Sequence, residues 1–285
     1  MYQLPLNRKR VLEKKIGETP LQVIERFKAD HPRYKDIPAT YAGRLDPMAS
    51  GKLLVLFGEE CKKKEEYIGL DKQYDIEVLL GVGSDTGDVL GITTLSTDVV
   101  LPARPLLISI LQKELGTHER PYPAYSSKAV DGKPLFLYAL EGTLGSISIP
   151  THAETIYDIR LLDIQSVTTS LLETHIKNTL SLAPVSFESS KELGADFRIT
   201  EVSKSWNEIF THDKEYSILK LRVTCGSGAY MRTLAERIGK DLGTNGLALS
   251  IHRRHIGKRS ILWEFLTISR SHTTLTISQC SAFIL

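Results

Sequence analysis

The residues best suited to chemistry lie in a glycine-containing segment, YAGRLDPMASG, at positions 41–51. Within it Asp46 precedes a proline, and an Asp-Pro pair taken alone is typical of a turn. However, Gly43 and Gly51 permit close approach of the backbone, and the apolar run that follows would hold the segment rigid. A carboxylate on a rigid loop is suited to nucleophilic catalysis. Asp46 is therefore either a turn residue or a carboxylate presented to a substrate.

A second candidate lies in TCGSGAYMRTLAERIGKDLG (224–243), where a strand, a glycine-rich turn and a helix are expected in succession. Arg232 falls in the first turn of that helix, where a cation opposes the helix dipole by about half a kcal/mol. An aspartate or a phosphate beside it would compensate; otherwise Arg232 is a solvated surface residue. The turn lacks the spacing and the Lys-Ser/Thr pair of a P-loop and the third glycine of a dinucleotide fingerprint. The sequence therefore predicts no nucleotide cofactor.

Tyr74 and a basic segment near the C-terminus are further candidates. Tyr74 lies on the apolar face of DKQYDIEVLLGV (71–82), where the periodicity favours a core position. IHRRHIGKRS (251–260) contains two histidines and four cations, and it is either a solvated edge or a contact to an RNA backbone. NRKRVLEKK (7–15) is a second basic segment of the same kind.

The elements that must position these residues mix helices and strands without regular βαβ spacing, so the predicted fold class is α+β. Periodicity and turn residues predict helices over 18–32, 104–116, the end of 121–142, and 229–243. They predict strands over 52–58, 71–82, 154–167 and 216–225, and a long loop over 31–51. Thr19 is the expected N-cap of the first helix. The segment 168–213 has weak periodicity and is expected to be an insertion or subdomain.

Composition indicates an ordinary globular chain. The 285 residues are 41% hydrophobic and 25% charged, and a formal net charge of +2 does not by itself indicate a nucleic-acid partner. Three cysteines without CxxC spacing argue against a disulfide framework or a zinc site. No N-terminal signal sequence and no apolar run of roughly 18 residues is present. The expectation is a cytoplasmic protein without a membrane span or a metal.

Taken in order, five stretches resemble the successive motifs of the TruB-type tRNA pseudouridine synthases. They are GRLDPMASGKLLVLFGEECK, DKQYDIEVLLGVGSDTGD, PYPAYSSKAVDGKPLFLYA, YDIRLLDI and LRVTCGSGAYMRTLAERIGKDLG. The resemblance covers residues 13–260 apart from the insertion. It implies the pseudouridine synthase fold, a mixed and mostly antiparallel central sheet flanked by helices, as one catalytic domain over 1–285. Many relatives carry an RNA-binding PUA domain, and the 25 residues after Ser260 are too few for one.

The resemblance also implies roles for individual residues. Asp46 matches the catalytic aspartate, Tyr74 the tyrosine that stacks on the target base and is implicated in proton transfer, and Arg232 the basic partner of the aspartate. An arginine beside the carboxylate favours its ionised form. The implied substrate-contacting residues are Tyr41, Gly43, Arg44, Leu45, Lys128, Tyr230, Arg253 and Arg254. Neither a cofactor nor a metal is implied, because the reaction involves no redox change.

Three positions depart from the family pattern. Tyr41-Ala42-Gly43 stands where bacterial members have His-Thr-Gly, and Tyr41 could stack on a base but would not titrate near neutrality. His252 stands where the family has an apolar residue before its Arg-Arg pair, and KKIGETP (14–20) replaces the DKPxGxTS opening.

The leading hypothesis is a monomeric enzyme that modifies the T arm of tRNA, at the uridine numbered 55. The alternatives are a catalytic subunit that depends on guide RNA, and an RNA-binding or tRNA-folding protein with little catalysis. The insertion at 168–213 is a hypothetical RNA-contacting element.

Overall fold

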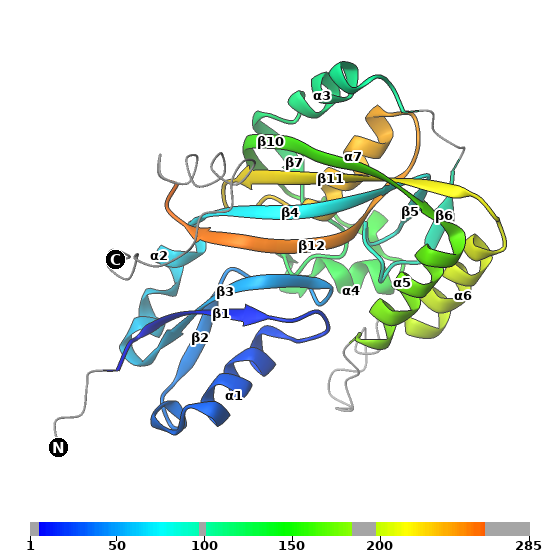
Figure 1. Ribbon diagram of the computed structural model, residues 1–285. Helices are drawn as coiled ribbons and strands as arrows, with labels where there is room; N and C mark the ends of the chain where they lie inside the picture. The colour runs from blue at the N-terminus through cyan, green and yellow to red at the C-terminus, as the bar shows by residue number, and fades with distance from the viewer. Residues whose placement is uncertain (1–5, 97–100, 184–197, 260–285) are drawn as a thin grey trace, which may run out of the picture.

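A mixed sheet of eight strands runs through the centre of the protein (Figure 1). The structure is a computed structural model that describes residues 6–96, 101–183 and 198–259. Neighbouring strands are antiparallel except for one parallel pair, β3 (Ala49–Phe57) with β12 (Gly246–Gly257). The strand order is β1 (Lys9–Lys14), β3, β12, β4 (Asp71–Leu80), β11 (Glu215–Cys225), β10 (Thr151–Thr168) and β7 (Gly116–Pro121), and β2 (Ala39–Ala42) pairs with β3.

Helices and short hairpins connect these strands. The α-helices are α1 (Pro20–Asp30), α2 (Lys64–Ile68), α3 (Arg104–Gln112), α4 (Leu135–Leu140), α5 (Thr169–Ser181), α6 (Ile199–Phe210) and α7 (Met231–Asp241). Short 3₁₀ turns lie at Pro32–Tyr34, Gly58–Lys63 and Leu144–Ser146. The hairpins are β5 (Val82–Ser84) with β6 (Thr93–Leu95), and β8 (Ala129–Val130) with β9 (Lys133–Pro134). No helix within the described ranges is both long and apolar enough to cross a membrane.

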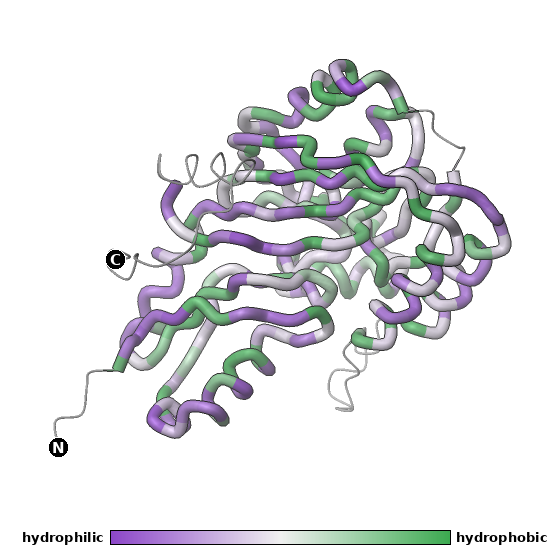
Figure 2. The backbone as a smooth tube through the Cα atoms, in the orientation of Figure 1, coloured by the Kyte–Doolittle hydropathy of each residue, from purple (hydrophilic) through white to green (hydrophobic). Residues whose placement is uncertain are grey.

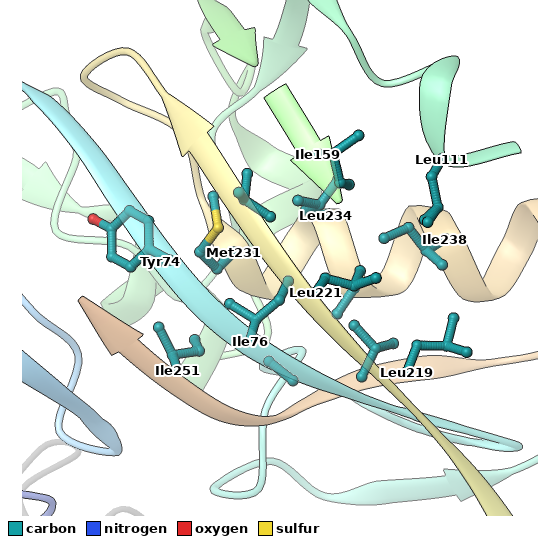
Figure 3. Close-up of a cluster of buried hydrophobic side chains, with 14 of the residues drawn as sticks. Tyr74, Ile76, Leu111, Ile159, Leu219, Leu221, Met231, Leu234, Ile238 and Ile251 are labelled. Carbon is teal, nitrogen blue, oxygen red and sulfur yellow. The ribbon is translucent and has the colours of Figure 1, made fainter. Parts of the chain in front are cut away.

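Apolar cores lie on both faces of the sheet, because successive side chains of a strand point to opposite faces. On one face, Tyr74 and Ile76 of β4 belong to the same cluster as Leu234 of α7 (Figure 3). On the other face, Leu79 of β4 joins a second cluster with Trp206 of α6. A third cluster packs α1 against β3. The sheet is thus the shared wall to which α7 and the α5–α6 pair are attached.

The sequence-based prediction of an α+β fold with a mostly antiparallel central sheet is confirmed. The four predicted strands appear as β3, β4, β10 and β11, and the four predicted helices appear as α1, α3, α4 and α7. The predicted N-cap is also confirmed, because the Thr19 side chain accepts from the Gln22 N–H within a capping box.

Two expectations about the chain between elements are wrong. The segment 31–51 is not one loop, since it contains β2 and the beginning of β3. The basic segment at 251–260 is not an edge, because β12 lies between β3 and β4 inside the sheet. Figure 2 shows strongly hydrophilic residues on this central strand. Because of these polar residues, the sequence shows no apolar pattern that would predict a strand here. In the structure their side chains bind the partners described below.

The segment 168–213 contains two helices, α5 and α6, that join the core cluster shared with β4 and β11. Residues 184–197 and the C-terminal residues 260–285 lie outside the described ranges. The weak periodicity of the segment therefore concealed helices that are well anchored to the sheet.

Gly51 is required where β3 approaches β12. Its φ is +104°, and a Cβ placed there would lie 2.3 Å from the carbonyl oxygen of Arg253. Gly51→Ala should therefore lower the free energy of unfolding by roughly 3 kcal/mol or more. Gly116→Ala is the matched control, because Gly116 has a φ of +96° but nothing within 4 Å of the added atom. It should cost about 1–2 kcal/mol in urea denaturation. Equal losses would show that the close approach is not what requires glycine.

Candidate active site

Asp46 and Arg232 form an ion pair between the β2–β3 loop and the first turn of α7. The Nε of Arg232 donates to Oδ2 of Asp46 at 2.8 Å. Asp46 is also a turn residue, because its carbonyl accepts from the Ala49 N–H. The side chain of Asp46 is 36% exposed whereas that of Arg232 is 5% exposed. In this pair the guanidinium is therefore buried and the carboxylate is partly accessible to solvent.

The guanidinium of Arg232 is held on all three of its nitrogens. In addition to the bond with Asp46, Nη1 donates to the carbonyl of Thr86 at 2.7 Å and Nη2 to the carbonyl of Tyr125 at 3.1 Å. Burial lowers the pKa of Arg232, but Asp46 and Asp88 outweigh this and raise it. Because every nitrogen is committed, the guanidinium has one orientation and presents one nitrogen to Asp46.

Asp88 is a second carboxylate behind the pair, and the sequence analysis missed it. Its Oδ2 lies 3.9 Å from Nε of Arg232. Its Oδ1 accepts from the hydroxyl of Thr86 at 2.7 Å and from the N–H of Leu90 at 3.0 Å. Burial raises the pKa of Asp88, Arg232 opposes the shift, and the charge of Asp46 adds to it. The signal for Asp88 was its place in the motif DKQYDIEVLLGVGSDTGD.

Tyr74 lies in the core on the same face of the sheet as α7. It is buried within the α7-facing cluster, and Figure 3 shows its hydroxyl directed away from the apolar side chains around it. Burial raises the pKa of Tyr74 to about 12; Arg253 opposes the shift and the charge of Asp46 adds to it. Tyr74 is therefore a core residue, as its periodicity predicts. The negative charge of Asp46 contributes to the raised pKa of its hydroxyl.

Arg253 supports the Asp46 loop from beneath. It is 1% exposed, and its nitrogens donate to the carbonyls of Lys52 at 2.7 Å, Gly43 at 3.1 Å and Arg44 at 3.3 Å. The guanidinium of Arg253 is thus occupied by these three carbonyls, and a contact between the other cations of segment 251–260 and RNA stays a prediction. Gly43 contributes its carbonyl from a backbone with a φ of +79°, which favours glycine.

Arg254 is separated from the Asp46 loop by the sheet. Its Nη1 donates to Oδ2 of Asp75 at 3.0 Å, and Asp75 also accepts two bonds from Arg222. Asp75 follows Tyr74 on β4 and therefore faces the other side. Of the two neighbouring arginines of β12, Arg253 thus binds the Asp46 loop and Arg254 binds Asp75, so the structure does not bring Arg254 to Asp46.

Lys14 is a buried cation that the sequence analysis overlooked within KKIGETP. Its Nζ donates to the carbonyls of Ala49 at 2.6 Å, Pro47 at 3.1 Å and Lys15 at 3.1 Å. Burial lowers the pKa of Lys14 to about 8, although Glu18 and Asp46 oppose the shift. Lys14 and Arg253 therefore hold the same loop from two sides.

Aromatic rings gather beside Tyr230, the N-cap residue of α7. Tyr122 and His152 are stacked with centroids 4.2 Å apart, and both meet Tyr230 edge-on. The Nζ of Lys128 lies 5.0 Å from the centroid of Tyr122. The N–H of Tyr230 donates to the buried carboxylate of Glu154 at 3.2 Å. The structure thus brings the predicted Tyr230 and Lys128 together through Tyr122 and His152, which the sequence analysis did not identify.

The remaining predicted residues flank the loop. Tyr41 packs partly against the α1 cluster, and the Nζ of Lys64 lies 5.5 Å from its ring centroid. Leu45 is buried in the α7-facing core, whereas the side chain of Arg44 is exposed. His252 is close enough to Ser50 for a hydrogen bond, with Nδ1 and Oγ 3.0 Å apart. Among the described residues, no three His, Cys, Asp or Glu side chains are grouped so as to hold a metal ion.

The buried charge of Lys14 predicts a pH dependence of stability. Between pH 8 and 10.5 the unfolded chain binds a proton at this lysine that the folded chain has released, so stability rises with pH across this window. Lys72, whose pKa burial also lowers to about 8, contributes in the same direction. In urea denaturation at pH 7.5 and 9.5, Lys14→Met should reduce the gain by about 1 kcal/mol or more. The exposed neighbour provides the control, Lys15→Met, which should keep the full gain. A full gain in Lys14→Met would contradict the burial of a charged Lys14.

The sequence is similar to one family of known proteins. Residues 34–180 match the model of the TruB family pseudouridylate synthases (N terminal domain). The tRNA pseudouridine synthase B of Psychrobacter cryohalolentis is 26% identical over 249 residues, which are 87% of this chain and 55% of that protein. The same enzyme of Cupriavidus taiwanensis is 31% identical over 219 residues, 77% of this chain and 54% of that protein. The chain spans about half the length of these relatives.

A solved structure has a similar fold. One chain of a Cbf5-Nop10-Gar1 complex superposes with a TM-score of 0.52 at 16% identity, over 89% of this chain and 50% of that chain. Because the family model covers more than half of the sequence, the chain belongs to the TruB family of pseudouridylate synthases.

Proposed function

We propose that this chain isomerises uridine to pseudouridine in tRNA, with Asp46 as the catalytic carboxylate and without a cofactor. The observation that carries the proposal is the ion pair of Asp46 and Arg232, in which the cation is sealed and the carboxylate is accessible. The substrate class is supported by the relatives, which are named tRNA pseudouridine synthase B.

The reaction breaks the bond between N1 of uracil and C1′ of the ribose, rotates the base, and joins C5 of the base to C1′. A proton leaves C5, a proton is gained at N1, and the composition of the nucleotide is unchanged. A carboxylate can assist by capturing positive character at C1′, as the second carboxylate of a retaining glycosidase does. It can also add to C6 of the base, and both routes require one accessible carboxylate oxygen.

Asp46 meets that requirement through its two unequal oxygens. Oδ2 is committed to Arg232, and within the described ranges no other side chain donates a hydrogen bond to the carboxylate. Oδ1 is therefore the oxygen directed to the substrate. Holding the nucleophile in one orientation before the substrate arrives is a large part of enzymatic rate enhancement.

The target uridine must leave its stack to reach this carboxylate, and aromatic side chains offer replacement stacking. The Tyr74 hydroxyl is protonated at neutral pH, as in any tyrosine whose pKa is not lowered, so it can donate a hydrogen bond. The Tyr230 ring, with Lys128 and Tyr122 beside it, provides aromatic and cationic contacts for the flanking nucleotides. We place the modified position in the T arm, at the uridine numbered 55.

Asp46→Asn keeps the shape of the side chain but removes its charge and its nucleophilic oxygen. Turnover on a tRNA transcript tritiated at C5 of uridine should fall at least about a thousandfold, measured as tritium release. Binding of the same transcript, measured by filter retention, should stay within about threefold because the RNA-contacting surface is intact. Asp36→Asn, on an exposed residue of the same N-terminal region, is the control and should retain activity.

Wild-type activity on a bare transcript, lost in Asp46→Asn, supports the proposal. A full rate of release from Asp46→Asn would contradict the assigned role of Asp46. Wild-type binding without any release, even with cell extract added, would favour the RNA-binding or tRNA-folding alternative. Release that appears only with extract would favour a catalytic subunit that needs partners.

A further inference from the structure

Helix α6 is bonded to the segment 84–93, which carries Thr86 and Asp88 of the site. The indole Nε1 of the fully buried Trp206 donates to the carbonyl of Val89 at 3.0 Å. The Oγ of Ser205 accepts from the N–H of Thr93 at 3.0 Å. The helix thus binds this segment by directed hydrogen bonds as well as by apolar packing.

Arg198, at the N-terminus of α6, adds a third attachment. Its Nη1 donates to Oδ2 of Asp85 at 2.7 Å and its Nη2 to Oδ1 at 3.2 Å, which is a bidentate pair. The hydroxyl of Tyr125 donates to Oδ2 of Asp85 at 2.9 Å. The guanidinium carbon of Arg198 also lies 5.0 Å from the ring centroid of Tyr125. Three groups from three segments therefore meet at Asp85.

The two segments joined at Asp85 are the same two that orient Arg232. Thr86, next to Asp85, accepts from Nη1 of Arg232 through its carbonyl. Tyr125 accepts from Nη2 of Arg232 through its carbonyl. Each segment therefore has one group that meets Arg198 and one that meets Arg232. The spacing between the two carbonyls, and so the direction of Nε toward Asp46, depends on what ties the segments together.

We propose that α6 is a brace for the catalytic centre, and that Arg198 is a positioning residue that acts through Asp85 and Tyr125 on Arg232. The proposal rests on the proposed function, because it concerns the orientation of the Asp46–Arg232 pair. Arg198 contacts Asp85 and Tyr125, and the segments of these two residues in turn bind Arg232. The RNA-contacting role considered for segment 168–213 stays a separate prediction.

Alternative explanations for these contacts predict different kinetics. A salt bridge that only stabilises the fold would have a modest effect at these exposures, 22% for Arg198 and 35% for Asp85, and would leave turnover unchanged. An arginine that binds RNA phosphates would change KM and its salt dependence and leave kcat unchanged. A positioning residue changes kcat, because it alters how the catalytic pair is held in the bound complex.

The test compares Arg198→Ala with Arg222→Ala in the full chain. Arg222 forms a bidentate pair with Asp75 at similar exposure, 18% and 29%, on the sheet face away from Arg232, and Asp75 keeps Arg254 when Arg222 is removed. In steady-state and single-turnover assays on a tRNA transcript, Arg198→Ala should lower kcat about tenfold or more with KM changed less than twofold. Arg222→Ala should stay within twofold in both.

Tyr125→Phe serves as the second variant, because it removes the hydroxyl that reaches Asp85 and keeps the carbonyl that holds Arg232. It should lower kcat several-fold without a change in KM, and it remains informative if Arg198→Ala does not fold. Wild-type kcat in both variants would overturn the proposal, as would a rise in KM alone. Lack of activity in the wild-type chain would instead count against the proposed function, so the two failures are distinguishable.

Discussion

A buried guanidinium can be accommodated only if each of its nitrogens finds an acceptor, because an unpaired charge out of water is costly. Arg232 meets this condition with one carboxylate and two backbone carbonyls from three separate segments. The hydrogen bonds of Arg232 therefore fix the relative positions of the β2–β3 loop, the turn between β5 and β6, and the segment after β7. The accessible carboxylate of Asp46 is the exposed end of this arrangement.

Two other buried cations near the Asp46 loop are also paired with backbone acceptors. Lys14 and Arg253 are both buried, and both place their hydrogens on backbone carbonyls of the segment that carries Asp46. Because a carbonyl is neutral, it does not cancel the charge of the cation that it binds. Lys14 therefore still interacts electrostatically with Asp46, and Arg253 with the Tyr74 hydroxyl. A loop without regular structure of its own thereby acquires a defined shape.

The sequence could predict what depends on local patterns. Tyr74 was placed correctly in the core by alternation. The misfit of Arg232 with the helix dipole left three possibilities, an aspartate partner, a phosphate or a solvated surface residue, and the structure shows the aspartate, Asp46. Residues whose role depends on distant segments could not be found in this way. Arg253 appeared to be a surface cation because its acceptors, the carbonyls near Gly43, lie some two hundred positions earlier in the chain. Lys14 was missed for the same reason.

The parallel pairing of β3 with β12 connects the Asp46 loop to a strand that is far away in the sequence. Only Ala49, Ser50 and Gly51 of β3 pair with β12, and these residues adjoin the loop that bears Asp46. Among the described strands, β12 comes last in the sequence, so its pairing with β3 joins an early and a late part of the described chain. Contacts between such distant residues form slowly. The support of the Asp46 loop by β12 therefore belongs to the late-forming part of the fold, because Arg253 and the Gly43 carbonyl that it binds lie 210 positions apart in the sequence.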